Sequence, residues 1–130
     1  MTVSIKRVYE KAAADDGFRV LVDRLWPRGI SKQRAEVDDW VKEIGPTDDL
    51  RTWFAHVPDR FGDFAKRYRA ELDTNAAVDT LRRYIADHDQ VTLVYSAKDT
   101  EHNQAVVLRD YLAGSSPPAG PPRRVQSGPT

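Results

Sequence analysis

The sequence predicts an α/β fold: a single small domain in which a short, mostly parallel sheet of about three strands packs with about five helices. Two observations support this prediction. Short apolar runs typical of buried strands lie on both sides of a long segment with helical periodicity. Near the end of the chain, a strand, a loop and a helix follow one another in the order found in α/β folds. A length of 130 residues suits one compact core.

Three segments are predicted to form strands. Residues 3–9 are rich in β-branched side chains and alternate imperfectly, while residues 19–25 and 91–96 contain the apolar runs of buried strands. Residues 15–17, Asp-Asp-Gly, supply a turn between the first two strands. The long helical connection between the second and third strands is compatible with a right-handed parallel crossover.

Helical spacing of apolar residues predicts the first helix after the second strand. Ser31 suits the N-cap of this helix, and Gly45 followed by Pro46 ends it. The apolar positions that recur at helical intervals are Val37, Trp40, Val41 and Ile44. The segment is therefore interpreted as one amphipathic helix.

Four more helices are predicted further along the chain. Thr47 caps the second, and Pro58 fits the first turn of the third. The fourth helix includes residues 78–85, and the last, residues 104–112, has Thr100 as its predicted N-cap. The aromatic residues at helical spacing are assigned to the core and not to a nucleic-acid stacking platform. They are Trp40, Trp53, Phe54, Phe61, Phe64 and Tyr68.

Composition narrows the classes of function. Twenty basic side chains offset twenty acidic ones, so no global field draws the protein to nucleic acid or to an anionic membrane. The chain has no cysteine, its three histidines are dispersed, and it carries no P-loop or Rossmann glycine motif, so we predict no metal and no cofactor. It also lacks a signal peptide and a membrane-spanning apolar run, which favours a cytoplasmic location.

The C-terminal segment differs in composition from the rest. Residues 114–130 hold five of the eight prolines and three of the seven glycines. We therefore predict a domain of residues 1–113 followed by a disordered tail. The tail sequence "PPAGPPR" also fits a proline-rich ligand of aromatic grooves.

The loop after the second predicted strand forms the first half of a candidate site, because its two arginines surround a Trp-Pro corner. Arg24 and Arg28 are suited to an anion clamp, since guanidinium groups bind phosphates and carboxylates through paired hydrogen bonds. Trp26 offers a flat face for stacking, and Lys32 extends the basic group. The alternative is a scaffold in which Asp23 pairs with the arginines and Trp26 is core.

The loop after the last predicted strand supplies the second half. Lys98 adds positive charge, His102 is the candidate general acid or base, and Asn103 can orient a substrate or water. Ser96 is a conceivable nucleophile, although no nucleophile-elbow motif surrounds it. The structural alternatives are a histidine that makes a cap or surface contact and a serine that bonds backbone.

The two loops are expected to form one pocket, because adjacent parallel strands end at the same edge of a sheet. We expect this pocket to bind a small anionic ligand, such as a nucleotide or another phosphorylated metabolite. Whether it catalyses a reaction is left open; hydrolysis or group transfer at a phosphate or glycosidic bond would suit His102 beside arginines. His56 and Arg67 are further residues that the fold can bring to the pocket.

Two other classes of function stay open. The first is nucleic-acid binding through a local basic patch, which the neutral net charge disfavours. Its residues would be Arg24, Arg28, Lys32 and Arg34. The second is a non-catalytic protein-interaction module that uses the proline-rich tail. The oligomeric state is also left open.

Three segments taken in order carry a family resemblance: "VDRLWPRGISK", "LRTWFAHVPDRFGDFAKRYRAEL" and "VTLVYSAKDTEHNQAVVL". They closely resemble the YeaO-like family of uncharacterised proteins, within the domain of unknown function 488, and the likeness covers nearly all of residues 3–112. The resemblance implies a small bacterial α/β domain without an established reaction. Other branches resemble this chain but carry Cys-His-Arg where it has Glu101, His102 and Asn103, so the resemblance transfers no cysteine chemistry.

Overall fold

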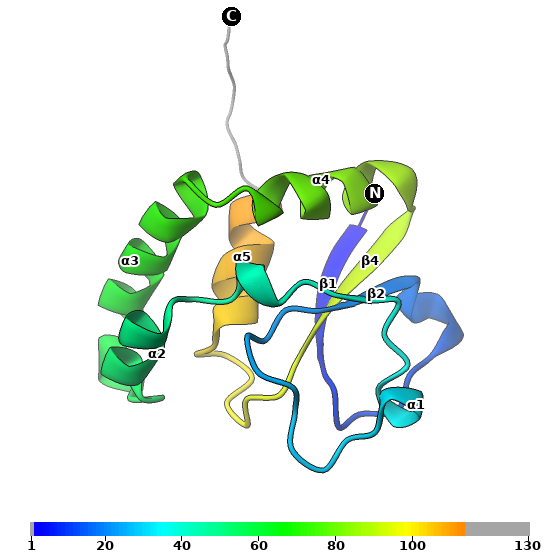
Figure 1. The fold of residues 1–130 in the computed structure, drawn as a ribbon, viewed down its shortest axis with the longest axis horizontal. Coiled ribbons are helices and arrows are strands. Elements are labelled where there is room, and N and C mark those ends of the chain that lie inside the picture. The colour runs from blue at the N-terminus through cyan, green and yellow to red at the C-terminus, as the bar shows by residue number, and fades with distance from the viewer. Residues whose placement is uncertain (1, 114–130) are drawn as a thin grey trace, which may run out of the picture.

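A computed structural model describes residues 2–113 as a four-stranded sheet packed with five α-helices (Figure 1). The strands are β1 (Thr2–Arg7), β2 (Phe18–Leu21), β3 (Asp39–Trp40) and β4 (Gln90–Tyr95). They lie in the order β1-β4-β2-β3, and every pairing is parallel. This confirms the α/β fold, with one strand more than predicted. The proposed tail, residues 114–130, lies outside the described residues.

The additional strand, β3, lies where the sequence predicted a helix, and that prediction was wrong. Asp39 and Trp40 pair with Val20 and Leu21 of β2, so the backbone of this segment completes the open edge of the sheet. The Trp40 indole Nε1 also donates to the Asp23 carbonyl oxygen at 2.7 Å. Helical spacing was present, but pairing with a neighbouring strand outweighed it, since periodicity alone does not fix the partner of a short segment.

The helices are α1 (Lys32–Ala35), α2 (Asp48–Phe54), α3 (Phe61–Asp73), α4 (Ala77–Asp87) and α5 (Gln104–Ala113). Ser31 and Thr47 cap α1 and α2 as predicted, because their hydroxyls accept from the Arg34 and Leu50 amides. Helices α4 and α5 pack on the sheet, α3 packs against α5, and α2 packs against α3. In Figure 1, α2 and α3 therefore lie beyond α5 as seen from the sheet.

The core occupies both faces of the central strands. Val20 and Leu93 face the larger apolar cluster under the helices, while Leu21 and Val94 face a smaller one beneath α1. Phe64 and Tyr68 of α3 are buried as predicted. Trp53 is partly buried and packs against the larger cluster, as Phe61 does. The guanidinium groups of Arg60 and Arg67 lie over the Trp53 ring, at 5.5 and 4.4 Å from the centroid.

The register of the sheet places two loops side by side. Leu21 is the partner of Val94, and the Val22 amide donates to the Val94 carbonyl oxygen at 3.0 Å. The chain segments that begin at Asp23 and Ser96 therefore leave the sheet at the same edge, as predicted. In parallel sheets this edge is the usual location of ligand sites.

Candidate functional site

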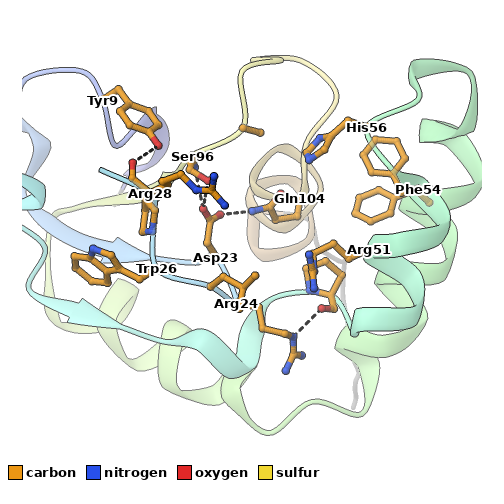
Figure 2. Close-up of a pocket in the computed structure, with 15 residues that line it drawn as sticks. Tyr9, Asp23, Arg24, Trp26, Arg28, Arg51, Phe54, His56, Ser96 and Gln104 are labelled. Atoms are coloured by element: carbon orange, nitrogen blue, oxygen red, sulfur yellow. Dashed lines mark hydrogen bonds between the residues drawn. The ribbon is translucent and has the colours of Figure 1, made fainter. Parts of the chain in front are cut away.

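A pocket of about 330 Å³ opens at the carboxyl ends of β2 and β4 (Figure 2). Its lining comes from the loops after β1, β2 and β4, from α2 and the segments on either side of it, from α3, and from the first residue of α5. The lining residues are Tyr9, Asp23, Arg24, Leu25, Trp26, Pro27, Arg28, Pro46, Arg51, Phe54, His56, Phe64, Ser96, Ala97 and Gln104. The volume is at the lower end of the range for small-molecule sites.

The carboxylate of Asp23 lies in the wall of this pocket and is only 7% exposed. Its Oδ2 accepts hydrogen bonds from the Ser96 amide at 3.0 Å and from the Ser96 hydroxyl at 2.5 Å. Its Oδ1 accepts from the side-chain amide of Gln104. The carboxylate after β2 is therefore bound by a residue that follows β4 and by the first residue of α5. The Ser96 hydroxyl proton points to this carboxylate.

The partners of Asp23 are neutral. No arginine or lysine among residues 2–113 forms a salt bridge with it, so the scaffold alternative with Asp23 paired to arginines is not what the structure shows. Burial raises the pKa of this carboxyl, and the hydrogen bonds from Ser96 and Gln104 together with the charge of His56 only partly oppose that shift.

The rim of the pocket is basic. Arg28 is exposed and forms no salt bridge within the described residues, and Figure 2 shows its side chain extending toward the space beside Asp23. Arg51 adds a second exposed guanidinium, whose Nη2 contacts Asp48 at 3.0 Å. Such surface pairs are weak, so Arg51 is available to a ligand anion.

Arg24 also lines the pocket, but its guanidinium is held by the backbone. Its Nε donates to the Pro46 carbonyl oxygen at 2.8 Å, and its Nη2 donates to that of Gly45 at 2.9 Å. Gly45 packs so closely that a Cβ there would lie 3.0 Å from the Arg24 amide nitrogen. Arg24 therefore ties two loops together, and Arg28 and Arg51 are the more exposed cations of the rim.

His56 reaches the pocket on a strained backbone. Ala55 and His56 both have positive φ, at 47° and 56°, a region that non-glycine residues rarely adopt. The turn that they form ends α2 and directs the imidazole toward the pocket, beside Phe54, as Figure 2 shows. The position of His56, left open by the sequence, is thus at the pocket, while Arg67 stacks on Trp53 and is not part of the lining.

Apolar side chains at the mouth are unusually exposed. Leu25 is 62% exposed and Tyr9 38%, and both line the pocket. Trp26 is held in place, because its indole Nε1 donates to the Ile30 carbonyl oxygen at 2.6 Å and its ring meets Trp40 edge-on. Exposed apolar surface beside a basic rim is typical of a binding site.

Three of the predicted site residues do not line this pocket. Lys98 is exposed in the loop between β4 and α5, outside the lining. His102 is half-buried, with its Nδ1 2.9 Å from Asp99 Oδ2 and its ring edge-on to Phe61. Amide donation from Glu101 and His102 lowers the pKa of the Asp99 carboxyl. The structure thus brings Arg24, Trp26 and Arg28 to one pocket without Lys98, His102 or Asn103.

Asn103 makes hydrogen bonds to the backbone and does not line the pocket, where it was predicted to orient a substrate or water. It is fully buried, its Oδ1 accepts from the Val106 amide at 3.0 Å, and its Nδ2 donates to the Asp99 carbonyl oxygen at 2.8 Å. Asn103 therefore caps α5, which corrects the prediction that Thr100 does so.

The sequence reasoning missed Tyr9, Arg51 and Gln104, and it treated Asp23 only as a partner for arginines. A signal for Asp23 was present, because an acidic residue directly after three buried apolar residues has to find a hydrogen-bonding partner. Gln104 carried a weaker signal as the first residue of the last helix. The other two come from segments whose approach to the pocket only the tertiary fold determines.

The four residues of the basic patch proposed for nucleic-acid binding do not all lie at the pocket. Arg24 and Arg28 line the pocket, whereas Lys32 and Arg34 lie exposed on α1 and are not part of the lining.

Within residues 2–113, no cluster of three histidine, aspartate or glutamate side chains is arranged to hold a metal ion. In the same part of the chain, no helix combines the length and apolar character needed to cross a bilayer.

The fold and the pocket define a small single-domain α/β protein, and comparison with known proteins identifies its relatives. The profile of a family described as "Inactive DUF488-N3 subclade" matches residues 2–119. The uncharacterized protein YeaO of Escherichia coli (strain K12) is 44% identical over 112 residues, covering 86% of this chain and 97% of YeaO. The uncharacterized protein Rv3073c of Mycobacterium tuberculosis (strain ATCC 25618 / H37Rv) is 43% identical over 112 residues, covering 86% and 94%. No solved structure matches.

The chain therefore belongs to the YeaO-like proteins of the DUF488 family. The matched region includes both loops of the pocket and all of the residues that line it.

Proposed function

We propose that the pocket binds a small anionic ligand that carries a phosphate group, and that binding itself is the function of this domain. The observation that carries the proposal is the rim: Arg28 and Arg51 are exposed cations at the mouth of a concave pocket. Guanidinium groups at such positions bind phosphate oxygens through charge-assisted hydrogen bonds.

The location of the pocket also supports a ligand site. It lies beyond the carboxyl ends of two adjacent parallel strands, where ligands of open α/β sheets gather. The strained turn at Ala55 and His56 and the exposed side chain of Leu25 both occur at this pocket. Strain and exposed apolar surface cost stability, so their coincidence at one pocket favours a functional reason.

Binding is favoured over catalysis by three observations. The matching family profile is described as an inactive subclade, and His102, the predicted general acid or base, does not line the pocket. The Ser96 hydroxyl donates to Asp23 and not to a histidine, which differs from the Ser-His pair that activates most serine nucleophiles. The proposal therefore assigns no reaction.

Thermal unfolding with a panel of phosphate compounds tests the proposal, because a ligand that binds only the folded state raises the melting temperature. The panel contains inorganic phosphate, ribose 5-phosphate and nucleoside monophosphates. At least one should stabilise the wild type, and Arg28→Ala should weaken its binding by about tenfold or more. Arg83→Ala, an exposed position on α4 outside the pocket, is the matched control and should bind as the wild type does.

Two outcomes would overturn the proposal. Either no phosphate compound stabilises the wild type, or Arg28→Ala and Arg83→Ala weaken binding equally. A steep loss of affinity for oligonucleotides with added salt, together with weak binding of every small phosphate, would favour the alternative of nucleic-acid binding.

A further inference from the structure

The hydrogen bonds of Asp23 leave one acceptor position unused. An ionised carboxylate has about four acceptor positions, two on each oxygen. Within residues 2–113, Oδ2 accepts from the amide and the hydroxyl of Ser96, while Oδ1 accepts from Gln104 alone. Asp23 lines the pocket and is 7% exposed, so a ligand in the pocket would lie beside this carboxylate.

This acceptor restricts where a ligand can place its charge. A phosphate oxygen in contact with Asp23 would meet a carboxylate that forms no salt bridge within residues 2–113, which is unfavourable in a buried site. The phosphate is therefore expected at the rim, near Arg28 and Arg51. The part of the ligand that lies beside Asp23 must instead supply a neutral hydrogen-bond donor.

We propose that the pocket selects phosphate esters that also carry a sugar hydroxyl, which donates to Oδ1 of Asp23 while the phosphate binds Arg28 and Arg51. This inference rests on the proposed function and names its ligand class: sugar phosphates and nucleotides. Carboxylates commonly bind ribose hydroxyls in nucleotide sites, since the hydroxyl is a good donor to an ionised oxygen.

The size and walls of the pocket agree with this class. A volume of about 330 Å³ suits a ligand no larger than a nucleoside monophosphate. Pro27, Pro46 and Phe54 provide apolar wall surface between Asp23 and the exterior, and Leu25 and Tyr9 extend it at the mouth. Apolar contacts of this kind pack against the carbon face of a sugar or against a base.

The decisive comparison uses the wild-type protein and matched ligands. Ribose 5-phosphate should bind about tenfold or more tightly than methyl phosphate, because only the former has hydroxyls to donate. A nucleoside 5′-monophosphate should likewise bind more tightly than its 2′,3′-dideoxy analogue. If both nucleotides bind weakly and ribose 5-phosphate binds well, the ligand is a sugar phosphate; the reverse identifies a nucleotide.

A variant isolates Asp23 itself. Asp23→Asn keeps the shape of the side chain and should reduce the preference for ribose 5-phosphate over methyl phosphate by about tenfold. Methyl phosphate should bind this variant as well as the wild type or better, because a negative charge has been removed. Asp110→Asn, an exposed carboxylate on α5, is the control and should keep the full preference.

The possible results separate this inference from the proposed function. Equal binding of ribose 5-phosphate and methyl phosphate, both lost in Arg28→Ala, would overturn the role of Asp23 and leave phosphate binding intact. If no phosphate compound binds, the proposed function fails first. If Asp23→Asn does not fold, the two ligand pairs measured on the wild type still decide.

Discussion

Two nearly buried carboxylates lie at opposite ends of β2, and their surroundings differ. Asp16, before the strand, is 8% exposed and contacts Arg19 Nη1 at 2.6 Å and Lys6 Nζ at 3.1 Å. Asp23, after the strand, has similar exposure, but in the part of the chain that the structure describes its side-chain donors are the neutral Ser96 and Gln104. Burial acts to raise both pKa values. At Asp16 the hydrogen bonds from the Ala13 amide, Lys6 and Arg19 outweigh burial and lower the pKa, whereas at Asp23 burial prevails.

The difference separates structural ion pairing from a ligand site. Arg19 also donates from Nε and Nη2 to the carbonyl oxygens of Glu36 and Ala35, at 2.9 and 2.7 Å, so the cluster around Asp16 joins β2 to the C-terminal end of α1. Asp23 lies in a pocket whose exposed cations are at the rim and not in contact with it. A carboxylate with satisfied charge holds the fold together, while one with neutral partners and an open acceptor position can recognise a ligand.

The largest expected effect is on the structural carboxylate. Asp16→Ala leaves the guanidinium of Arg19, 4% exposed, without its counter-charge, and should lower the free energy of unfolding by about 3–5 kcal/mol. Urea unfolding measures this loss. Asp15→Ala, at the exposed neighbouring position, is the control and should change stability by less than about 0.5 kcal/mol. Equal losses of stability for the two variants would contradict the structural role assigned to Asp16.

A smaller effect is expected at Ser96. Ser96→Ala removes the hydroxyl that donates to Asp23 and should lower the free energy of unfolding by about 1 kcal/mol. It should also raise the pKa of the Asp23 carboxyl further, because one of the bonds that favours the ionised form is lost. NMR titration of the carboxyl carbon measures the pKa, and an unchanged or lower value would contradict the hydrogen-bond account.

Asp23→Asn should have the smallest effect on stability. The amide side chain can still accept from Ser96, and an amide oxygen of Gln104 can turn toward the new donor. At neutral pH the free energy of unfolding should therefore stay within about 1 kcal/mol of the wild type. A loss as large as that of Asp16→Ala would show that Asp23 is also structural.

The two carboxylates also predict opposite dependences of stability on pH. The folded-state pKa of Asp23 lies above its ordinary value of 3.8, so its contribution is fully present below 3.8 and is lost as the pH rises through the raised value. For Asp16 the folded-state pKa is lowered, so its contribution is present above 3.8 and is lost as the pH falls through the lowered value.

Unfolding free energies measured as a function of pH test these signs. Both proteins of the first comparison carry His56→Gln, because the charge of His56 acts on Asp23. On this background, the wild-type Asp23 protein should gain stability relative to Asp23→Asn as the pH is lowered toward 3.8. Relative to Asp16→Asn, the wild type should lose stability below that value. Parallel curves for the wild type and both variants would contradict the assigned shifts.

The sequence predicted the parts of the fold that depend on local patterns. Apolar runs located the strands β2 and β4, and the caps at Ser31 and Thr47 were correct because a cap is a local hydrogen bond. The segment around Trp40 was wrong, since its helical spacing gave no sign that β2 had an open edge to pair with. Trp53 packs against the core, but its spacing gave no sign that two arginines would cover the other side of its ring.

The candidate site was predictable only at the level of the sheet edge. The rule for parallel strands placed the loops after β2 and β4 together, and Arg24, Trp26 and Arg28 do line the pocket. From the second loop the sequence indicated Ser96, which lines the pocket, but not Ala97 or Gln104, because the path of residues 96–104 depends on the cap formed by buried Asn103. The prediction favoured Lys98 and His102 because their side chains can carry charge. In the structure the neutral side chains of Ser96 and Gln104 contact Asp23 instead.

The most direct test of the ligand site is an NMR titration of isotope-labelled protein with ribose 5-phosphate. The account predicts that the largest and saturable chemical-shift changes occur at the Ser96 amide, the Gln104 side-chain amide and the Arg28 guanidinium, because these groups surround the proposed contacts. Changes concentrated on α1 or on residues 98–102, with Ser96 and Gln104 unaffected, would contradict it.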